Sequence, residues 1–413
     1  MSSDRTRRPS PRSFVWLPFT QMSSFDPNRR TFVRARGTEL VDSMGKTTFD
    51  AVSSIWTTIH GHCHPYITEA IGRQAGILDH ATALGATNPV AEELAQRLCE
   101  RSGLSHVFFA SDGASAVEAA LKMALQFWQN AGHAERQRFV HLHCSYHGDT
   151  VGAMSVSDIA VFRDRFAPFC FETIAFERFE DVIARPDIAA VIVEPLVQAA
   201  AGMRVVPVER YRSLAAPMAP LLIVDEVATG FGRTGTFFAT EQTGMKPDLL
   251  CIGKGLSGGA LALSATLATT RVYEAFSSSP SELRHFFHGH SYAANPIACA
   301  AALASLELFE REQTLAHVAS LAQHLAVLLA QLRDDPRIAQ VRHLGLMSAI
   351  EIVPERFPSA RSTPTPAWNV ADAMYERGHF TRPLGNAIQL VPPLSSSTAE
   401  LDSFVEALVA SLP

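Results

Sequence analysis

The sequence predicts an α/β protein whose larger part contains a mostly parallel sheet, with a smaller α+β part built from both chain ends. Apolar runs that resemble buried strands alternate with helical patterns such as residues 116–128. The runs lie at residues 139–142, 189–193, 221–224 and 248–252. Strands that alternate with helices are joined by crossover connections, and these connections make neighbouring strands parallel.

The two chain ends supply the smaller part of the predicted fold. Strand-like pieces occur at residues 31–34 and 39–41, and strand character returns at residues 341–352. A proline-containing loop is expected at residues 354–366. We therefore predict three regions: a disordered tail at residues 1–13, a small domain at residues 14–59 and 301–413, and a large domain at residues 60–300.

Composition excludes several classes of function. The chain has 413 residues and a net charge of −6, so nothing attracts it to nucleic acid, and the basic residues 5–12 are interpreted as part of the solvated tail. The longest apolar stretch, residues 188–206, is interrupted by Glu194, Gln198 and Arg204, which argues against a membrane span. The 6 cysteines are scattered and fit free thiols in a reducing cytoplasm.

An acid ends one of the buried runs. Residues 221–224 are apolar and are followed by Asp225 and Glu226. In open α/β sheets, ligands bind in the crevice at the carboxyl ends of the strands. Asp225 is therefore either a ligand-binding carboxylate or only the cap of the following turn, and this strand alone does not separate the two.

A lysine follows another buried run. Lys254 comes after residues 248–252 and is flanked by Gly253 and Gly255, with Gly258 and Gly259 close behind. Burial lowers the pKa of a lysine, which turns the amine into a usable nucleophile and base. The plain alternative is a strand-end lysine that points to water. The glycines favour the functional interpretation, because they let a bulky ligand approach the backbone.

Small residues precede the helix predicted at residues 116–128. The segment at residues 111–118 begins with Ser111, Asp112, Gly113 and Ala114. Free backbone N–H groups and the helix dipole at such a start form a binding site for phosphate. The alternative is an ordinary N-cap made by Ser111 or Asp112.

Together these features fit pyridoxal phosphate. This cofactor needs a lysine for its aldehyde, an anion site for its phosphate and a carboxylate beside its ring nitrogen. The interval between Asp225 and Lys254 leaves room for one crossover unit between two strands. Tyr146 is the candidate for an aromatic ring that stacks on the cofactor.

Further motifs extend the pattern over nearly the whole chain. They are WLPFTQM at 16–22, HGH at 60–62 with HP at 64–65, YHGDT at 146–150, VEP at 193–195, DEVATGFGRTG at 225–235, GKG at 253–255, HGHSY at 288–292 and TRPLG at 381–385. On these motifs, residues 16–412 resemble the class III (ω-type) aminotransferases, which have the pyridoxal-phosphate fold type I. The segments around Asp225 and Lys254 are the most specific for this class.

The resemblance implies roles in cofactor binding. Lys254 would carry the cofactor as a Schiff base, and Asp225 would pair with its ring nitrogen. Gly113 and Ala114 would present backbone donors to the phosphate. Tyr146 would stack on the ring and take part in catalysis. His147 and Glu194 would complete the cofactor pocket, with Glu194 organising it or a hydrogen bond at a strand end.

The resemblance also implies a substrate site and a partner. Phe19, Trp56, Tyr146 and Gly289 would lie near the substrate, and Arg382 would bind a substrate carboxylate, a bidentate task that suits a guanidinium group. Ser291 would reach the phosphate site of a neighbouring subunit. The resemblance therefore implies a homodimer with shared active sites and small-molecule substrates.

The segments at residues 16–22 and 381–385 resemble the biotin-pathway branch of the class. Members of that branch convert 8-amino-7-oxononanoate to 7,8-diaminononanoate by ping-pong transamination, with S-adenosylmethionine or lysine as amino donor. Phe19 and Ile55 stand where some relatives carry tyrosine and tryptophan, and Asp112 stands where serine is more frequent. Three alternatives stay open: an aminotransferase of specialised metabolism, a general ω-amine transaminase, and a cofactor-binding protein without catalysis.

Two groups of histidines could suggest metal sites. The histidines within residues 60–64 and 288–290 have no spacing that fixes tetrahedral geometry, so packing and turn roles are predicted and no metal is expected. Arg233 lies among glycines and is either a turn residue or a movable substrate ligand.

Overall fold

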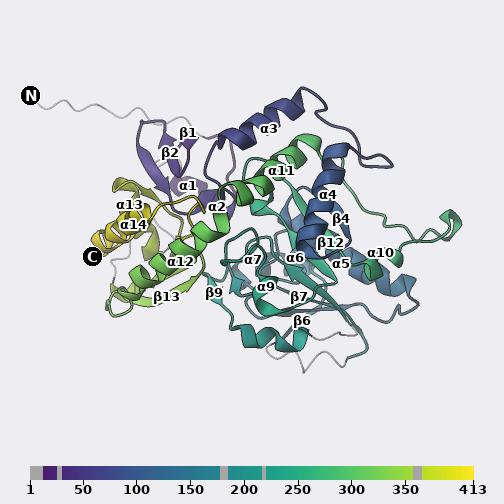
Figure 1. Ribbon diagram of the computed structural model, residues 1–413. Coiled ribbons are helices and arrows are strands. Elements are labelled where there is room, and N and C mark those ends of the chain that lie inside the picture. The colour runs from purple at the N-terminus through teal and green to yellow at the C-terminus, as the bar shows by residue number, and fades with distance from the viewer. Residues whose placement is uncertain (1–12, 26–29, 177–184, 216–219, 357–364) are drawn as a thin grey trace, which may run out of the picture.

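A mostly parallel seven-stranded sheet forms the larger part of the protein (Figure 1). The computed structural model describes residues 13–25, 30–176, 185–215, 220–356 and 365–413, so nearly all of the predicted tail lies outside the described residues. The strand order is β4 (His106–Ala110), β12 (Ser264–Ala268), β11 (Leu249–Ile252), β10 (Leu221–Asp225), β7 (Ile188–Val193), β5 (Arg138–Leu142) and β6 (Thr173–Phe176). Only β12 runs antiparallel to its neighbours, which confirms the predicted fold class.

The central strands are buried on both faces. Leu222 and Val224 of β10 belong to one apolar cluster, and Leu221 and Ile223 belong to another on the opposite face. Helix α5 (Gly113–Asn130) supplies much of the second cluster, while α4 (Pro89–Ser102) and α11 (Pro296–Arg311) contribute to the first. This double cover explains why the strands read as continuous apolar runs in the sequence.

The carboxyl edge of this sheet gathers the polar residues that follow its strands. Asp225 ends β10, Glu194 follows β7, and Tyr146 lies beyond the end of β5. Lys254 follows β11 at the start of a short 3₁₀ helix, η4 (Lys254–Ser257), and α5 begins three residues after β4. The parallel arrangement therefore brings distant parts of the sequence to one edge.

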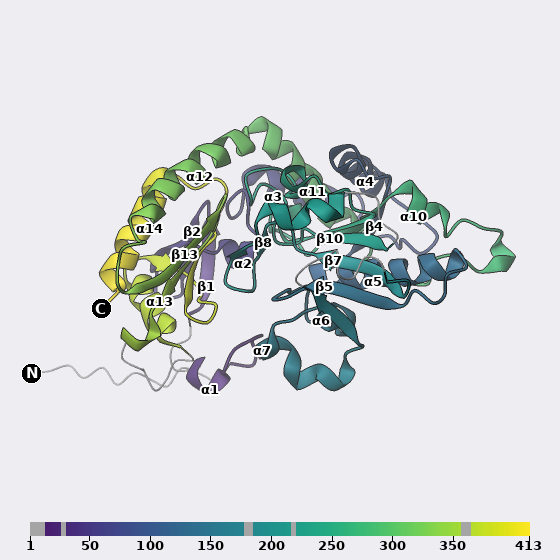
Figure 2. The ribbon, with the colours of Figure 1, turned by 90° about the horizontal axis from the view of Figure 1, so that it is seen from below.

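The smaller sheets combine residues from both chain ends. β1 (Phe32–Arg36), β2 (Glu39–Asp42) and β3 (Thr47–Asp50) form a four-stranded sheet with β15 (His379–Phe380), which pairs parallel to β3. β13 (Ile338–Leu344), β14 (Met347–Ile352) and β16 (Ala387–Leu390) form a second sheet. Figure 2 shows α12 (Thr314–Ala330), α13 (Pro366–Glu376) and α14 (Thr398–Ser411) beside these strands, away from the large sheet.

Short elements connect these parts. The remaining helices are α1 (Met22–Phe25), α2 (Ser53–Trp56), α3 (Pro65–Ala75), α6 (Val151–Ser155), α7 (Ala160–Arg163), α9 (Thr240–Thr243) and α10 (Thr270–Glu274), with a two-stranded ribbon of β8 (Val197–Gln198) and β9 (Arg204–Val205). The 3₁₀ turns besides η4 are η2 (Asp164–Phe169), η3 (Val208–Ala215), η5 (Pro280–Glu282) and η6 (Pro354–Arg356). The boundary predicted after residue 300 falls inside α11, and the domain limits stay a prediction.

The histidines within residues 60–64 contact protein groups. His60 is buried, and its Nε2 lies 3.0 Å from the Ser305 carbonyl oxygen. His62 Nε2 lies 2.8 Å from Asp50 Oδ2, and His64 caps α3 and lies 3.1 Å from Glu312. Across the described part of the chain, no helix is long and apolar enough to span a bilayer.

Candidate active site

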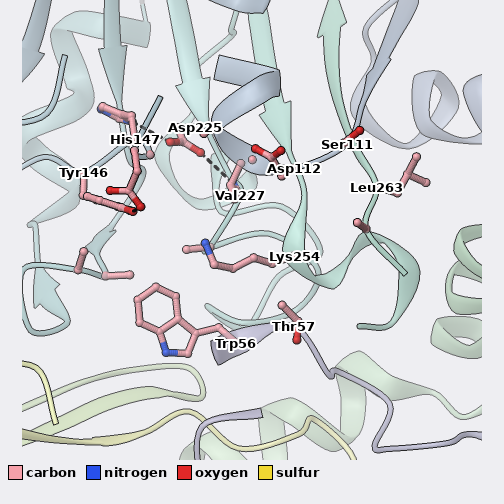
Figure 3. A pocket seen from close by; sticks show the side chains of 18 of the residues that line it. Trp56, Thr57, Ser111, Asp112, Tyr146, His147, Asp225, Val227, Lys254 and Leu263 are labelled. Atoms are coloured by element: carbon pink, nitrogen blue, oxygen red, sulfur yellow. Dashed lines mark hydrogen bonds and ion pairs between the residues drawn. The ribbon is translucent and has the colours of Figure 1, made fainter. Parts of the chain in front are cut away.

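A cavity of about 630 Å³ opens at the carboxyl edge of the large sheet (Figure 3). It brings together eight of the residues predicted for the site: Trp56, Gly113, Ala114, Tyr146, His147, Glu194, Asp225 and Lys254. They come from five connections that follow β4, β5, β7, β10 and β11, and from α2 of the smaller part. The cavity therefore collects its lining from sequence positions up to about 200 residues apart.

Lys254 points into this cavity between Trp56 and Asp225 (Figure 3). Its Nζ lies 5.2 Å from the centre of the Trp56 ring, within range of a cation–π interaction. Burial lowers the pKa of the Lys254 amine, while the nearby carboxylates of Asp225, Glu194 and Asp149 act in the opposite direction. A buried amine with a lowered pKa is suited to nucleophilic attack and proton transfer.

Asp225 is held in a fixed orientation by two donors. Its Oδ2 accepts a hydrogen bond of 2.7 Å from His147 Nδ1, and its Oδ1 accepts one of 3.0 Å from the Val227 backbone N–H. The carboxylate is 5% exposed and faces the cavity. His147 is fully buried, and its Nε2 has no hydrogen-bond partner among the described residues. The pair presents an oriented negative charge to a ligand.

The start of α5 forms one wall of the cavity. Asp112 caps this helix through a 2.9 Å hydrogen bond from the Ser115 N–H, so the capping alternative for Asp112 is observed. The first N–H groups of a helix have no partner within it, and here Gly113 and Ala114 contribute them to the cavity lining. These donors and the helix dipole can still bind a phosphate group.

Gly113 leaves no room for a side chain. A Cβ at this position would lie 2.4 Å from Cγ1 of Val227, in the loop that follows Asp225. We expect Gly113→Ala to displace this loop or the helix start, and to weaken phosphate binding roughly tenfold or more, as overpacking costs about 1–3 kcal/mol. The dissociation constant of pyridoxal phosphate measures this effect. Gly72→Ala in α3 is the matched control, since nothing lies within 4 Å of its added Cβ, and unchanged cofactor binding in both variants would contradict the expectation.

Glu194 is a buried acid beside the cavity. Its Oε2 accepts a 3.0 Å hydrogen bond from the Tyr146 N–H, and its Oε1 accepts one of 3.3 Å from the Ala199 N–H. Burial raises the pKa of Glu194 from 4.5 to about 7. His147 acts to lower this pKa, and Asp225 acts to raise it further. The side chain therefore organises the segments after β5 and β7 and changes charge near neutral pH.

The raised pKa of Glu194 predicts a pH-dependent stability. The folded protein binds a proton on Glu194 between pH 4.5 and about 7 that the unfolded chain releases, so stability falls as pH rises through this window. We expect the free energy of unfolding of Glu194→Gln, relative to that of the wild type, to rise by up to about 3 kcal/mol between pH ~5 and ~8. Chemical denaturation of both proteins at these pH values measures the difference.

Comparing the wild type with Glu194→Gln isolates the contribution of Glu194 to the pH dependence of stability. Glu226, whose pKa burial also raises to about 7, and His60 and His141, whose pKa values burial lowers to about 4, are present in both. A stability difference that does not change with pH would contradict the assignment.

Tyr146 links the cavity to the aromatic rings of Phe162 and Phe19. Its hydroxyl donates a 2.8 Å hydrogen bond to Asp149 Oδ2, and burial together with Asp149 raises the pKa of the phenol. The Tyr146 ring meets Phe162 edge to face at 5.6 Å, and Phe162 meets Phe19 at 5.4 Å. Phe19 is thus placed next to the cavity through Phe162 rather than in its lining.

Besides Phe19, three predicted residues lie outside the cavity lining. Arg382 is partly buried, with its guanidinium carbon 6.0 Å from the centre of the Trp368 ring. Gly289 lines a separate cavity together with Leu84 and His288. Ser291 is exposed. A single chain therefore leaves Gly289 and Ser291 apart from Lys254.

Sequence patterns missed several residues around the site. Asp149 bonds Tyr146 and lies in the YHGDT motif, but the sequence assigned it no role; Gln389 bonds the Trp56 indole and lies in no such motif. Arg233 is 1% exposed and donates to the backbone oxygens of Pro392, at 2.5 Å, and Trp56, at 3.2 Å. Arg233 is therefore held in the interior. The glycines around it gave no signal of that burial.

The comparisons with known proteins agree with this arrangement. The family described as Aminotransferase class-III matches residues 23–412. The adenosylmethionine-8-amino-7-oxononanoate aminotransferase of Aquifex aeolicus is 39% identical, over 96% of this chain and 95% of that protein. The crystal structure of the enzyme of that name from Methanocaldococcus jannaschii superposes with a TM-score of 0.89 at 35% identity, covering 97% of this chain and 96% of that one.

The chain belongs to the class III aminotransferases. An amine transaminase from an uncultivated Pseudomonas species, solved with pyridoxal phosphate bound, is also similar, with a TM-score of 0.87 and 31% identity over 98% of this chain and 99% of that one. As a class III aminotransferase the protein is a pyridoxal-phosphate enzyme, and its fold is type I. The predictions of family, fold and cofactor are therefore confirmed.

The residues present fit this cofactor. Gly113, where a Cβ would strike Val227, lets the start of α5 pack closely on the loop that follows Asp225, and His147 Nδ1 orients the carboxylate that a ring nitrogen requires. Lys254 would hold the aldehyde, Asp225 the ring nitrogen, and Gly113 and Ala114 the phosphate. When bound, the cofactor accepts the electron pair released at the substrate carbon, which is the chemistry that amino transfer needs.

Proposed function

We propose that the protein aminates 8-amino-7-oxononanoate to 7,8-diaminononanoate, a step of biotin synthesis, with S-adenosylmethionine or lysine as amino donor. The observation that carries this proposal is the match, over nearly the full length of both proteins, to an adenosylmethionine-8-amino-7-oxononanoate aminotransferase at 39% identity. The cavity adds support, because it contains the amine, the carboxylate and the helix start that a class III aminotransferase uses.

The chain's own residues have separate tasks in this reaction. The Nζ of Lys254, whose pKa burial lowers, takes the proton from the substrate carbon that carries the amino group. Trp56 covers one side of the cavity and limits the access of water to this proton. Arg382 binds the carboxylate at the far end of the substrate, since a guanidinium group pairs with a carboxylate through two parallel hydrogen bonds.

Growth of a biotin auxotroph that lacks this step tests the proposal. The wild-type gene should restore growth without biotin, and the purified protein should form 7,8-diaminononanoate from 8-amino-7-oxononanoate with one of the two donors. Assays with each donor alone identify which one is used. Soluble protein that neither restores growth nor forms the diamine would reject the proposed substrate.

A general ω-amine transaminase is the second candidate. The similarity to the Pseudomonas amine transaminase, at 31% identity over almost the whole of both chains, supports it. The two candidates differ in substrate range. Rapid turnover of simple amines that lack a carboxylate, with slow turnover of 8-amino-7-oxononanoate, would favour the general enzyme.

We also propose that the protein is a cytoplasmic homodimer with shared active sites. Leu84, which lines a cavity with Gly289, is exposed, and so are Phe287 and Tyr292 on either side of Gly289 in the sequence; exposed apolar side chains of this size are typical of an interface. Ser291 lies in the same segment and is exposed, as a residue that serves a partner's phosphate site would be. Analytical ultracentrifugation tests the dimer, and a monomer at assay concentration would reject it.

A further inference from the structure

Trp56 reaches the cavity from an unusual backbone turn. The φ angles of Ser53, Ser54, Ile55 and Trp56 are 47°, 49°, 64° and 69°, so α2 is a left-handed turn of four residues other than glycine. L-residues avoid this conformation because Cβ approaches the following carbonyl oxygen. Such a turn persists only where the surroundings hold it, and strain of this kind is concentrated at functional sites.

The backbone of this turn is anchored by buried polar groups. Asp50 is fully buried, and its carboxylate accepts hydrogen bonds from the backbone N–H groups of Val52, at 3.2 Å, and Ser54, at 2.8 Å. At the other end of the turn, Arg233 donates to the Trp56 carbonyl oxygen. These contacts fix the path of the main chain, but they leave the direction of the indole ring to its own side-chain contacts.

Gln389 holds the indole ring of Trp56 by a hydrogen bond. This residue of β16 is 1% exposed, and its Oε1 accepts a hydrogen bond of 2.9 Å from Nε1 of Trp56. Nζ of Lys254 lies over one face of the same indole ring, 5.2 Å from the ring centre. The indole N–H is therefore bonded on the side of the smaller sheets, while the ring is turned toward the reacting amine.

The amide nitrogen of Gln389 makes a second contact. Its Nε2 donates to the backbone carbonyl oxygen of Arg382, in the loop between β15 and β16. Thr381, the residue before Arg382, donates from Oγ1 to the Gln389 carbonyl oxygen at 2.7 Å. One buried residue thus joins the aromatic wall beside Lys254 to the loop that carries the arginine proposed for the substrate carboxylate.

We propose that Gln389 is a positioning residue that sets the substrate's specificity by fixing Trp56 and Arg382 relative to one another. A substrate with a reacting carbon at one end and a carboxylate at the other is recognised only if both groups are met at once, so the fixed relation selects chain length. The inference rests on the proposed function in its use of Arg382 as the carboxylate site. It assigns Gln389 no contact with substrate or cofactor.

Two substitutions of Gln389 test its hydrogen bonds to Trp56 and to Arg382 separately. At alkaline pH, where its carboxyl group is ionised, Gln389→Glu keeps an oxygen for the indole N–H but has no donor for the Arg382 carbonyl oxygen, whereas Gln389→Leu loses both bonds. Removing one partner of a buried hydrogen bond leaves the other group unsatisfied, and this weakens binding by roughly 5- to 100-fold. We therefore expect both variants to raise KM for 8-amino-7-oxononanoate about tenfold or more. Only Gln389→Leu should also lower kcat, because only it releases Trp56 from its place beside Lys254.

A binding measurement provides a readout that does not need turnover. Nonanoate has the carboxylate and chain length of the proposed substrate without its amine or ketone, and nonanamide is the same chain without the charge. Calorimetric titration of the holoenzyme should show nonanoate binding that is about tenfold weaker in both Gln389 variants, with nonanamide binding unchanged. Gln340→Leu, at an exposed position of β13 in the same sheet, is the control and should bind nonanoate like the wild type.

A double-mutant cycle tests whether Gln389 acts through Trp56. Trp56→Phe removes the indole N–H, so Gln389→Leu should lower kcat by a smaller factor in that background than in the wild type. Additive effects on kcat would overturn the inference, and so would equal losses of nonanoate and nonanamide binding. If the wild type binds nonanoate more tightly than the Gln389 variants and yet fails to aminate 8-amino-7-oxononanoate, that result would reject the proposed function and leave the inference standing.

Discussion

Replacing Lys254 by alanine should abolish amino transfer, with a loss in kcat on the order of 10⁴-fold or more, because one amine serves both as nucleophile and as proton carrier. The variant also loses the covalent attachment of the cofactor, while Gly113, Ala114 and Asp225 still offer noncovalent contacts. We expect the wild type to keep its visible absorption band after desalting, and the variant to lose it. Borohydride reduction followed by peptide mass analysis should find the cofactor on residue 254 of the wild type only.

Lys246→Ala is the control for this prediction. Lys246 is an exposed lysine eight residues before Lys254, outside the cavity, and its replacement should change neither kcat nor the absorption band. Removal of Lys254 also leaves Asp225 and Glu194 without the nearby cation, so circular dichroism must first show that the variant is folded. A folded Lys254→Ala variant with substantial turnover would contradict the role given to this amine.

The larger sheet could be predicted because its signals are local. Apolar runs such as residues 221–224 mark strands that are buried on both faces, and the helical pattern at residues 116–128 marks α5, which begins earlier, at Gly113, where Asp112 caps it. The start of a helix depends on a cap more than on periodicity, which explains this difference. The Ala/Leu-rich run after Asn295 likewise marks α11, which ends at Arg311, and this one continuous helix crosses the boundary predicted after residue 300.

The residues of the site likewise divide into those that the sequence could predict and those that it could not. Asp225, Glu194 and Lys254 directly follow buried strands, and the rule that ligands bind at the carboxyl edge of a parallel sheet places them together. Gln389 and Asp50 could not be predicted, because each acts through a hydrogen bond to a residue whose neighbourhood only the tertiary fold creates. Arg233 shows the same limit: glycines surround it in the sequence, but its guanidinium group lies in the interior.

Replacing Asp225 by asparagine should lower kcat on the order of 10²- to 10³-fold while leaving the fold intact. The carboxylate supplies a fixed negative charge to the ring nitrogen of the cofactor, and an amide of the same shape does not keep that nitrogen protonated. Asparagine can still accept from the Val227 N–H, but its NH₂ group would face His147 Nδ1, which now donates to Asp225 Oδ2. The pH dependence of kcat and of the cofactor's absorption band measures the lost protonation.

A cofactor with a permanent charge tests the cause of this loss. Pyridoxal phosphate methylated at the ring nitrogen needs no carboxylate to stay cationic, so it should restore part of the activity of Asp225→Asn and give the wild type no advantage. Asp248→Asn is the matched control, because Asp248 accepts from the Leu222 N–H at 3.0 Å just before β11 and lies outside the cavity lining. It should lower stability by about 1 kcal/mol and leave kcat unchanged. If both variants lost activity equally, the charge at residue 225 would be structural, and the proton balance assigned to the site would be wrong.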